Sequence, residues 1–252
     1  MVDTHSHIYD EAYSEDFEDV VARAKGAGVE HLILPGIDSS CHSAMMNCAE
    51  KLGGYASAAI GLHPTSVAEN WRDELQFVFD NIGDRFCAIG EIGLDEYWSK
   101  DFLKEQMEVF EAQLNLSAEL DLPVIIHSRE ATEDIFSVLD AVKKPMKGVF
   151  HAFSGSYETY CRIKKYGDFK IGIGGVITYK NSHTASFLNK VPLSDILLET
   201  DAPWLTPVPF RGKRNESSYI KYIAEKVAEL MNLPFEEIDR ATTENAKSMF
   251  KL

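Results

Sequence analysis

Eight short runs of apolar, often β-branched residues recur along the whole chain. Each run is nearly continuous rather than strictly alternating, which is typical of parallel strands covered on both faces. The predicted strands are residues 1–5, 31–36, 56–64, 86–95, 122–128, 147–155, 169–175 and 195–203. If the first strand continues through residues 2–7, His5 and His7 point to the same side, because side chains two apart on a strand share a face.

Segments with the apolar spacing of helices separate these strands. Residues 14–28 have Ser14 as the expected cap and end at glycine, and residues 39–54 have Ser39 or Ser40 as cap and stop at Gly53. Residues 100–121 carry a stripe expected to face the core: Phe102, Met107, Phe110, Leu114 and Leu120. Further helices are predicted at 132–144, 157–167 and 181–191, and two or three within 216–252, broken at Leu233 and Pro234.

The alternation of strands and helices predicts an α/β fold, the (β/α)8 TIM barrel. A doubly wound open sheet is the alternative, but no Gly-x-Gly-x-x-Gly motif follows a strand, and residues 172–175 are too short and wrongly spaced. No long linker, low-complexity stretch or internal repeat interrupts the chain. We therefore expect one domain spanning residues 1–252.

The composition, 45% hydrophobic and 26% charged, suits a globular protein with a sizeable core. No apolar run is long enough to cross a bilayer, and we expect no cleaved signal peptide, because cleavage would remove His5 and His7. The four cysteines form no Cys-x-x-Cys pair, which favours free thiols and a cytoplasmic location.

The net charge of −15 argues against a protein that coats nucleic acid, since such proteins are usually basic. It does not exclude an enzyme that acts on phosphodiesters. Remote surface charges are screened over about 8 Å at physiological salt, and bound divalent cations would dominate the field in a cleft. Any contact with nucleic acid should therefore be weak and cation-dependent.

Residues able to bind metal or transfer protons end most of the predicted strands. They are His5, His7, His63, Glu91, His127, His151, Glu199 and Asp201, whereas His31, His42 and His183 lie elsewhere. The carboxyl ends of barrel strands meet at one face, so these side chains should converge there. Structural roles are open for some of them: His63 could cap its strand, and His127 and His151 could be satisfied core histidines. For Glu91 such a role is disfavoured, because burying its carboxylate without a cation would cost several kcal/mol.

Without His63, which could be structural, and Glu199, which should support a ligand, four histidines and two carboxylates remain. These are more ligands than one ion needs, which predicts two divalent cations bridged by one carboxylate. Glu91 is the natural bridge, since its strand lies between the two groups of ligands in barrel order. Imidazole ligands favour Zn²⁺ or Mn²⁺, with Fe²⁺ and Co²⁺ also suitable, whereas Mg²⁺ would be unusual on nitrogen. Glu199 lies two residues before Asp201, and Asp3 lies two residues before His5. Each should therefore support that ligand from behind.

The predicted chemistry is metal-assisted hydrolysis, in which paired cations lower the pKa of a water molecule. No Gly-x-Ser-x-Gly elbow is present, and no cysteine lies beside a strand-end histidine to act as a nucleophile. The pattern leaves the scissile bond open among an amide, a lactone, a deaminated ring and a phosphodiester.

A series of motifs, in order along nearly the whole chain, resembles the TatD family of metal-dependent deoxyribonucleases, which are amidohydrolase-like barrels. The motifs are "VDTHSH", "GLHP", "GEIGLD", "PVIIHSREA", "HAFSGS", "IGIGG", "LLETDAPWLTPVPFRGKRNE" and "TTENAKSMF". The departures are an alanine after His151, where the family often has cysteine, and "DAPW" in place of Asp-Ser-Pro-Tyr. Neither departure changes an expected ligand.

The resemblance implies a role for each strand-end residue. His5, His7 and Asp201 would hold one cation, His127 and His151 the other, and Glu91 would bridge them. Asp201 would also handle the proton of the attacking water. His63 would face the scissile phosphate, and Arg129 and Arg211 would clamp its oxygens.

The resemblance also implies a substrate: DNA, often single strands trimmed from the 3′ end, with no obligatory protein partner and no membrane. Tyr97, Trp98 and Trp204 could stack bases or simply pack the loops. The basic run at residues 210–216 could contact phosphate or be a solvated surface. Two rivals remain: a lactonase, amidase or phosphotriesterase on the same barrel, and a metal-stabilised binding or scaffold protein. Many of the former bridge their metals with a modified lysine on strand four, where this chain has Glu91.

Overall fold

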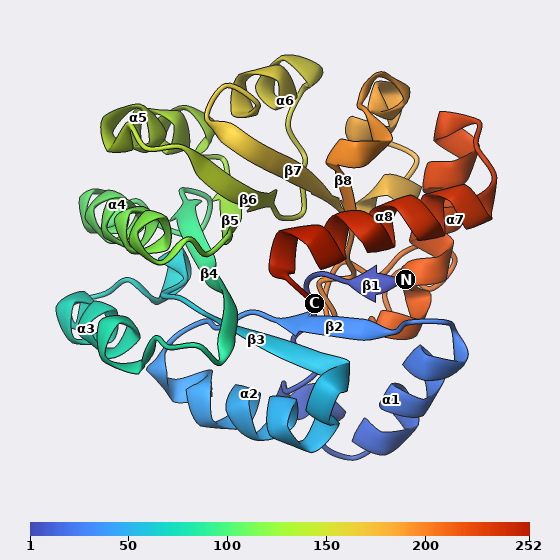
Figure 1. Cartoon of the computed structure of the whole chain (residues 1–252), viewed down its shortest axis with the longest axis horizontal. Helices are drawn as coiled ribbons and strands as arrows, with labels where there is room; N and C mark the ends of the chain where they lie inside the picture. The colour runs from blue at the N-terminus through green and yellow to red at the C-terminus, as the bar shows by residue number, and fades with distance from the viewer.

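The computed structural model describes all residues from 1 to 252 and shows eight parallel strands in one sheet, ordered β1 to β8 (Figure 1). The strands are β1 (Val2–Asp3), β2 (His31–Leu34), β3 (Ala56–Ile60), β4 (Phe86–Asp95), β5 (Val124–Arg129), β6 (Met146–Phe150), β7 (Gly167–Ile173) and β8 (Ile196–Leu198). Backbone hydrogen bonds join the ends of the sheet, from Thr4 to Leu198 and from His7 to Ala202. The predicted TIM barrel is confirmed.

Most of the helices surround the barrel, and one lies across its end (Figure 1). None of them is long and apolar enough to cross a membrane. They are α1 (Phe17–Gly26), α2 (Ser39–Leu52), α3 (Trp71–Asn81), α4 (Leu103–Leu120), α5 (Thr132–Val142), α6 (Tyr157–Ile163), α7 (Ile220–Met231) and α8 (Phe235–Phe250). The predicted break at Leu233 and Pro234 is confirmed. The helix predicted at 181–191 is wrong: two three-residue 3₁₀ turns lie there, as suits a segment that begins with Asn, Ser, His and Thr.

Several predicted helix details differ in the structure. Helix α1 begins at Phe17, so Ser14 is not its cap, and α2 is capped by Asp38, whose carboxylate accepts a hydrogen bond from the Ser40 amide. This carboxylate lies one residue before Ser39, the first residue of the helix, and also favours the positive end of the helix dipole. Gly53 ends α2 with a φ of 56°, as predicted. Leu120 is 46% exposed and does not belong to the core-facing stripe of α4.

An apolar layer fills the barrel beneath the predicted site. It consists of Val2, Ile33, Ala59, Ala88, Ile125, Val149 and Leu197, packed against Ala246, Met249 and Phe250 of α8. Side chains two residues further along a strand point the same way, so His127, His151 and Glu199 follow directly above Ile125, Val149 and Leu197. The apolar layer is therefore the floor of the site, and α8 closes the opposite end of the barrel.

Candidate metal centre

A β-bulge aims Glu91 into the barrel. Ile89 pairs with Val124 and Ile92 with Ile126, so three residues of β4 advance against two of β5. Strict alternation from the inward-facing Ala88 turns Gly90 inward, where a Cβ would meet the side chain of Ile125, and the extra residue turns Glu91 inward as well. The Glu91 side chain is only 4% exposed and lies among imidazoles.

The two carboxylate oxygens of Glu91 face different groups of histidines. Oε2 lies 3.1 Å from His5 Nε2 and 4.0 Å from His7 Nε2. Oε1 lies 2.9 Å from His127 Nδ1 and 3.6 Å from His151 Nε2. Glu91 is therefore the one carboxylate that contacts both groups through separate oxygens.

Residues that follow β1 and β8 bring His5, His7 and Asp201 together. Strand β1 ends at Asp3, so the predicted strand through His7 is too long, but Ser6 forms an isolated bridge with Ala202. His5 and His7 flank this bridge and share a side, with their Nε2 atoms 3.1 Å apart. Asp201 Oδ1 lies 3.7 Å and 3.8 Å from these two nitrogens, and 4.0 Å from His151 Nε2.

Buried polar groups support the imidazoles from behind. Glu199 Oε1 lies 3.0 Å from His151 Nδ1, so this carboxylate lies behind His151 and not, as predicted from the sequence, behind Asp201. Asp3 does not contact the His5 ring: its carboxylate accepts hydrogen bonds from the Thr200 amide and hydroxyl, at 2.9 Å and 2.7 Å. Asp3 thus fixes the segment between Glu199 and Asp201.

Two supporting residues were missed in the sequence. Asp95 Oδ2 lies 2.9 Å from His127 Nε2, and the Tyr9 hydroxyl lies 2.8 Å from His7 Nδ1. Asp95 ends the "GEIGLD" motif and Tyr9 follows His7 by two residues, so alternation beyond the ligands could have suggested both. Asp95 also accepts hydrogen bonds from the amides of Tyr97 and Trp98, which ties that loop to the His127 ring.

A cleft of about 360 Å³ opens above these side chains. His63, Arg129, Trp98 and Trp204 line it together with the histidines and carboxylates. His63 Nε2 is 3.5 Å from Glu91 Oε1, while Trp98 and Trp204 are 70% and 47% exposed. Arg211 does not line the cleft, because its guanidinium lies over the Tyr179 ring, 4.5 Å from the ring centre.

The surroundings of the two carboxylates shift their pKa values in opposite directions. Burial acts to raise the pKa of Glu91, but the neighbouring imidazoles, His5 first, outweigh burial and hold that pKa well below its usual range. Burial raises the pKa of Asp201 to about 6 despite His151 and His5. For His151, burial acts to lower the pKa, but Glu199, Glu91 and Asp201 raise it to about 10.

The arrangement fits divalent cations. Imidazole nitrogens and carboxylate oxygens of His5, His7 and Asp201 lie within 4.8 Å of one another, as do those of His63, Glu91 and His127. Glu91 Oε1 also faces both His127 Nδ1, at 2.9 Å, and His151 Nε2, at 3.6 Å. The ring nitrogens of His5 and His7 lie close together and are both directed at carboxylate oxygens. Two neutral imidazoles placed in this way are suited to hold one cation together.

Comparison with known proteins identifies the family of this chain. The model of TatD related DNases matches residues 2–251. The chain belongs to the TatD family. A relative from Bacillus subtilis, the uncharacterized metal-dependent hydrolase YabD, is 40% identical, and the alignment covers all of this chain and 99% of YabD.

Solved structures agree with the family assignment. The crystal structure of the TatD homologue YjjV from Escherichia coli matches with a TM-score of 0.90 at 32% identity, covering 100% of this chain and 98% of YjjV. An organophosphorus hydrolase from Deinococcus radiodurans matches with a TM-score of 0.66 at 11% identity, over 99% of this chain and 92% of the other. At this low identity, the match shows only that the organophosphorus hydrolase and this TatD protein have the same barrel fold.

Proposed function

We propose that this TatD-family metal-dependent hydrolase cleaves phosphodiester bonds of DNA and removes nucleotides from the 3′ end of single strands. The observation that supports this most directly is the Glu91 carboxylate, with one oxygen toward His5 and the other toward His127. Such a bridge suits a pair of cations, and the matching family model is one of DNases. The four cysteines are free thiols, which supports a reducing, cytoplasmic setting.

In this proposal His5, His7 and Asp201 would hold one divalent cation, His127 and His151 would hold the second, and Glu91 would serve both. Zn²⁺ and Mn²⁺ suit these nitrogen-rich ligands better than Mg²⁺ does. When bound, the cations supply Lewis acidity and neutralise negative charge on the phosphodiester.

The chain itself supplies orientation and proton transfer. Asp201 accepts the proton of the attacking water, because its carboxylate lies where both groups of imidazoles meet. Asp95 and Glu199 fix the rings of His127 and His151. His63 and Arg129, which line the cleft, contact the scissile phosphate, and we assign no such contact to Arg211, which packs on Tyr179.

The exposed rings of Trp98 and Trp204 offer surfaces on which bases stack at the mouth of the cleft. The Arg129 guanidinium lies 3.7 Å from the centre of the Tyr97 ring and 5.2 Å from that of Trp98. We infer that the β4–α4 loop and Arg129 act together, with the aromatic rings on the bases and the guanidinium on the phosphate.

Chelation and metal readdition test the proposal. Protein treated with a chelator should lose hydrolysis of a 20-nucleotide single strand, and Zn²⁺ or Mn²⁺ should restore it. Paired strands labelled at the 3′ or the 5′ end reveal polarity: the 3′ label should leave first as a mononucleotide. Inert oligonucleotides together with rapid turnover of a lactone or phosphotriester panel would overturn the phosphodiesterase assignment.

A substitution beneath the site should weaken metal binding without touching a ligand. A Cβ at Gly172 would lie 2.1 Å from Glu199 Oε2, so Gly172→Ala should displace Glu199 from His151. The expected result is a loss of about 1–3 kcal/mol in unfolding free energy and about 10- to 100-fold weaker metal affinity, measured by titrating the metal-free protein. Gly174→Ala is the matched control, because its nearest contact is an ordinary 3.7 Å. Equal effects of the two variants would contradict the supporting role of Glu199.

A further inference from the structure

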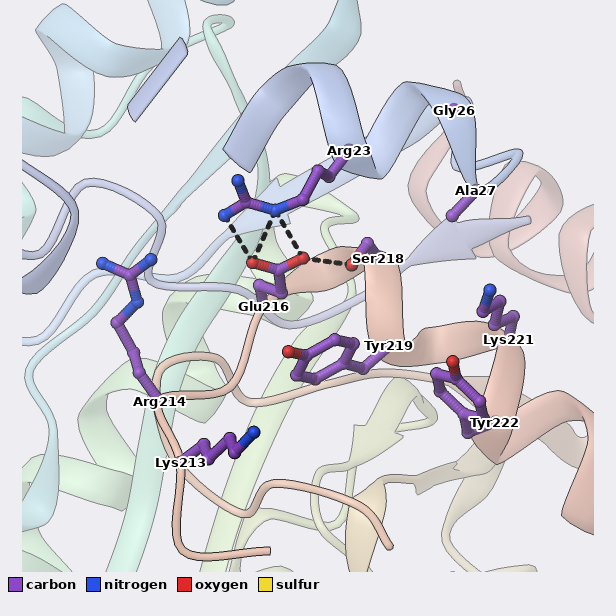
Figure 2. A pocket seen from close by; sticks show the side chains of 10 residues that line it. All are labelled: Arg23, Gly26, Ala27, Lys213, Arg214, Glu216, Ser218, Tyr219, Lys221 and Tyr222. Carbon is purple, nitrogen blue, oxygen red and sulfur yellow. Dashed lines mark hydrogen bonds and ion pairs between the residues drawn. The ribbon is translucent and has the colours of Figure 1, made fainter. Parts of the chain in front are cut away.

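A second cleft, of about 710 Å³, lies between α1 and the loop that leads from β8 into α7 (Figure 2). Its walls include Lys213, Lys221, Tyr219 and Tyr222, with Arg23 and Glu216 at one side. We call this cleft the lysine groove. None of these residues lines the cleft of the metal centre.

Unpaired positive charge distinguishes the lysine groove. Arg23 is held by Glu216 at 2.6 Å, and Arg214 is held by Asp16 at 2.7 Å, so both guanidinium groups are neutralised locally. Lys213 and Lys221 have no carboxylate within 4.0 Å. Two free ammonium groups in one cleft of a chain with net charge −15 form a local attractive site for an anion.

Aromatic rings lie beside both free ammonium groups. Tyr219 stacks on Phe210 with ring centres 4.3 Å apart, and Phe210 meets Tyr222 edge to face at 5.2 Å. Lys213 Nζ is 5.9 Å from the centre of the Phe210 ring, and Lys221 Nζ is 4.9 Å from that of Tyr222. Half-buried rings next to free cations are the pattern by which proteins hold single-stranded nucleic acid, with bases on the rings and phosphates on the cations.

One loop carries residues of both the lysine groove and the metal cleft. Asn215 lies between two groove residues, Arg214 and Glu216, and is fully buried. Its amide donates to the Pro203 carbonyl at 3.0 Å, and its side chain donates to the carbonyls of Thr200 at 2.8 Å and Trp204 at 2.6 Å. Trp204 lines the metal cleft, so these hydrogen bonds tie a residue at the mouth of that cleft to the segment that carries Arg214 and Glu216 of the groove.

We propose that the lysine groove binds the part of a single-stranded nucleic acid that lies outside the metal centre, through phosphates on Lys213 and Lys221 and bases on Tyr219 and Tyr222. This inference rests on the proposed function, because the groove would give the proposed nuclease a second contact with long substrates. No chemistry takes place in the groove, which adds affinity for strands too long for the metal cleft.

The double variant Lys213→Ala/Lys221→Ala tests the phosphate contacts. Binding of a fluorescein-labelled 20-mer of thymidine is measured by anisotropy, in the Asp201→Asn background with metal present, over a range of salt concentrations. The slope of log affinity against log salt is negative, and loss of two phosphate contacts should reduce its magnitude by about 1.4. Tyr222→Leu should instead weaken binding about 5- to 100-fold at an unchanged salt slope.

Kinetics with two substrates separate the groove from the reaction. In the otherwise unchanged enzyme, the double lysine variant should raise KM for the 20-mer but leave kcat/KM unchanged for p-nitrophenyl thymidine phosphate, which fills only the metal cleft. The matched control is Lys143→Ala/Lys165→Ala, which removes the same charge from two exposed lysines that follow α5 and α6. The control should behave as wild type with both substrates.

Three outcomes would overturn the groove: a salt slope unchanged by the double lysine variant, an equal decrease in the control, or equally tight lysine-dependent binding of an acidic peptide. Failure of the proposed function looks different, since wild type would then hydrolyse neither phosphodiester. The anisotropy experiment would still decide whether the groove binds single strands.

Discussion

Asp201→Asn is expected to lower kcat for oligonucleotide hydrolysis by about 10³-fold while the barrel stays folded. The amide keeps the shape of the carboxylate but cannot accept a proton, and it is a weaker ligand for a divalent cation. Asp201 Oδ1 lies within 4.0 Å of imidazole nitrogens from both groups, and Glu91, the other carboxylate that reaches both groups, is the proposed bridge between the cations. Initial rates at saturating Mn²⁺, combined with thermal melting, measure turnover and folding separately.

Asp195→Asn is the matched control for this variant. Asp195 is a buried carboxylate at the other end of β8, where it pairs with Lys164 at 3.0 Å and accepts a hydrogen bond from Tyr160 at 2.6 Å. Its replacement should lower the melting temperature and leave kcat unchanged. If Asp201→Asn kept more than about a tenth of wild-type turnover, Asp201 would not be the proton acceptor. The alternative of a metal-stabilised binding or scaffold protein would then be favoured.

The barrel could be predicted because its signal is carried by whole strands. Apolar runs on both faces require cover by helices, and few folds other than a barrel place eight such strands in sequence. Helix caps were harder to predict. Asp38 rather than Ser39 or Ser40 caps α2, because Asp and Ser are both favoured at this position and the sequence offers three of them in a row. Helix α3 was absent from the predicted segments, although Trp71, Leu75 and Val78 have helical spacing.

The candidate site could be predicted as a set of residues but not as a geometry. Strand ends indicated which side chains converge, because all carboxyl ends of the strands share one face. The bulge that aims Glu91 and the ring nitrogen that His127 presents depend on pairing between β4 and β5. The packing of Arg211 on Tyr179 is a tertiary contact between distant loops, which no local pattern encodes.

Glu91→Gln should abolish hydrolysis and also destabilise the metal-free protein in a pH-dependent way. Glu91 has a lowered pKa in the fold, so its stabilising effect is present above the ordinary carboxyl pKa and is lost as pH falls. His151 has a pKa raised to about 10, so its stabilising effect is complete below about 6.5 and is lost as pH rises toward 10. The stabilising effects of both groups are therefore complete only between about pH 4.5 and 6.5. Removing one partner there should cost about 3–5 kcal/mol in unfolding free energy.

Urea unfolding of chelated protein at pH 5.5 and pH 9.5 measures this difference. The cost of Glu91→Gln should be largest at pH 5.5 and should shrink at pH 9.5, where wild-type His151 also begins to lose its proton. Glu216→Gln is the control, because its partner is the Arg23 guanidinium, which stays protonated throughout this range. A cost of Glu91→Gln that was the same at both pH values would mean that neutral hydrogen bonds, rather than charged imidazoles, hold this carboxylate in the barrel. The basis for assigning it as a bridge between cations would then be weaker.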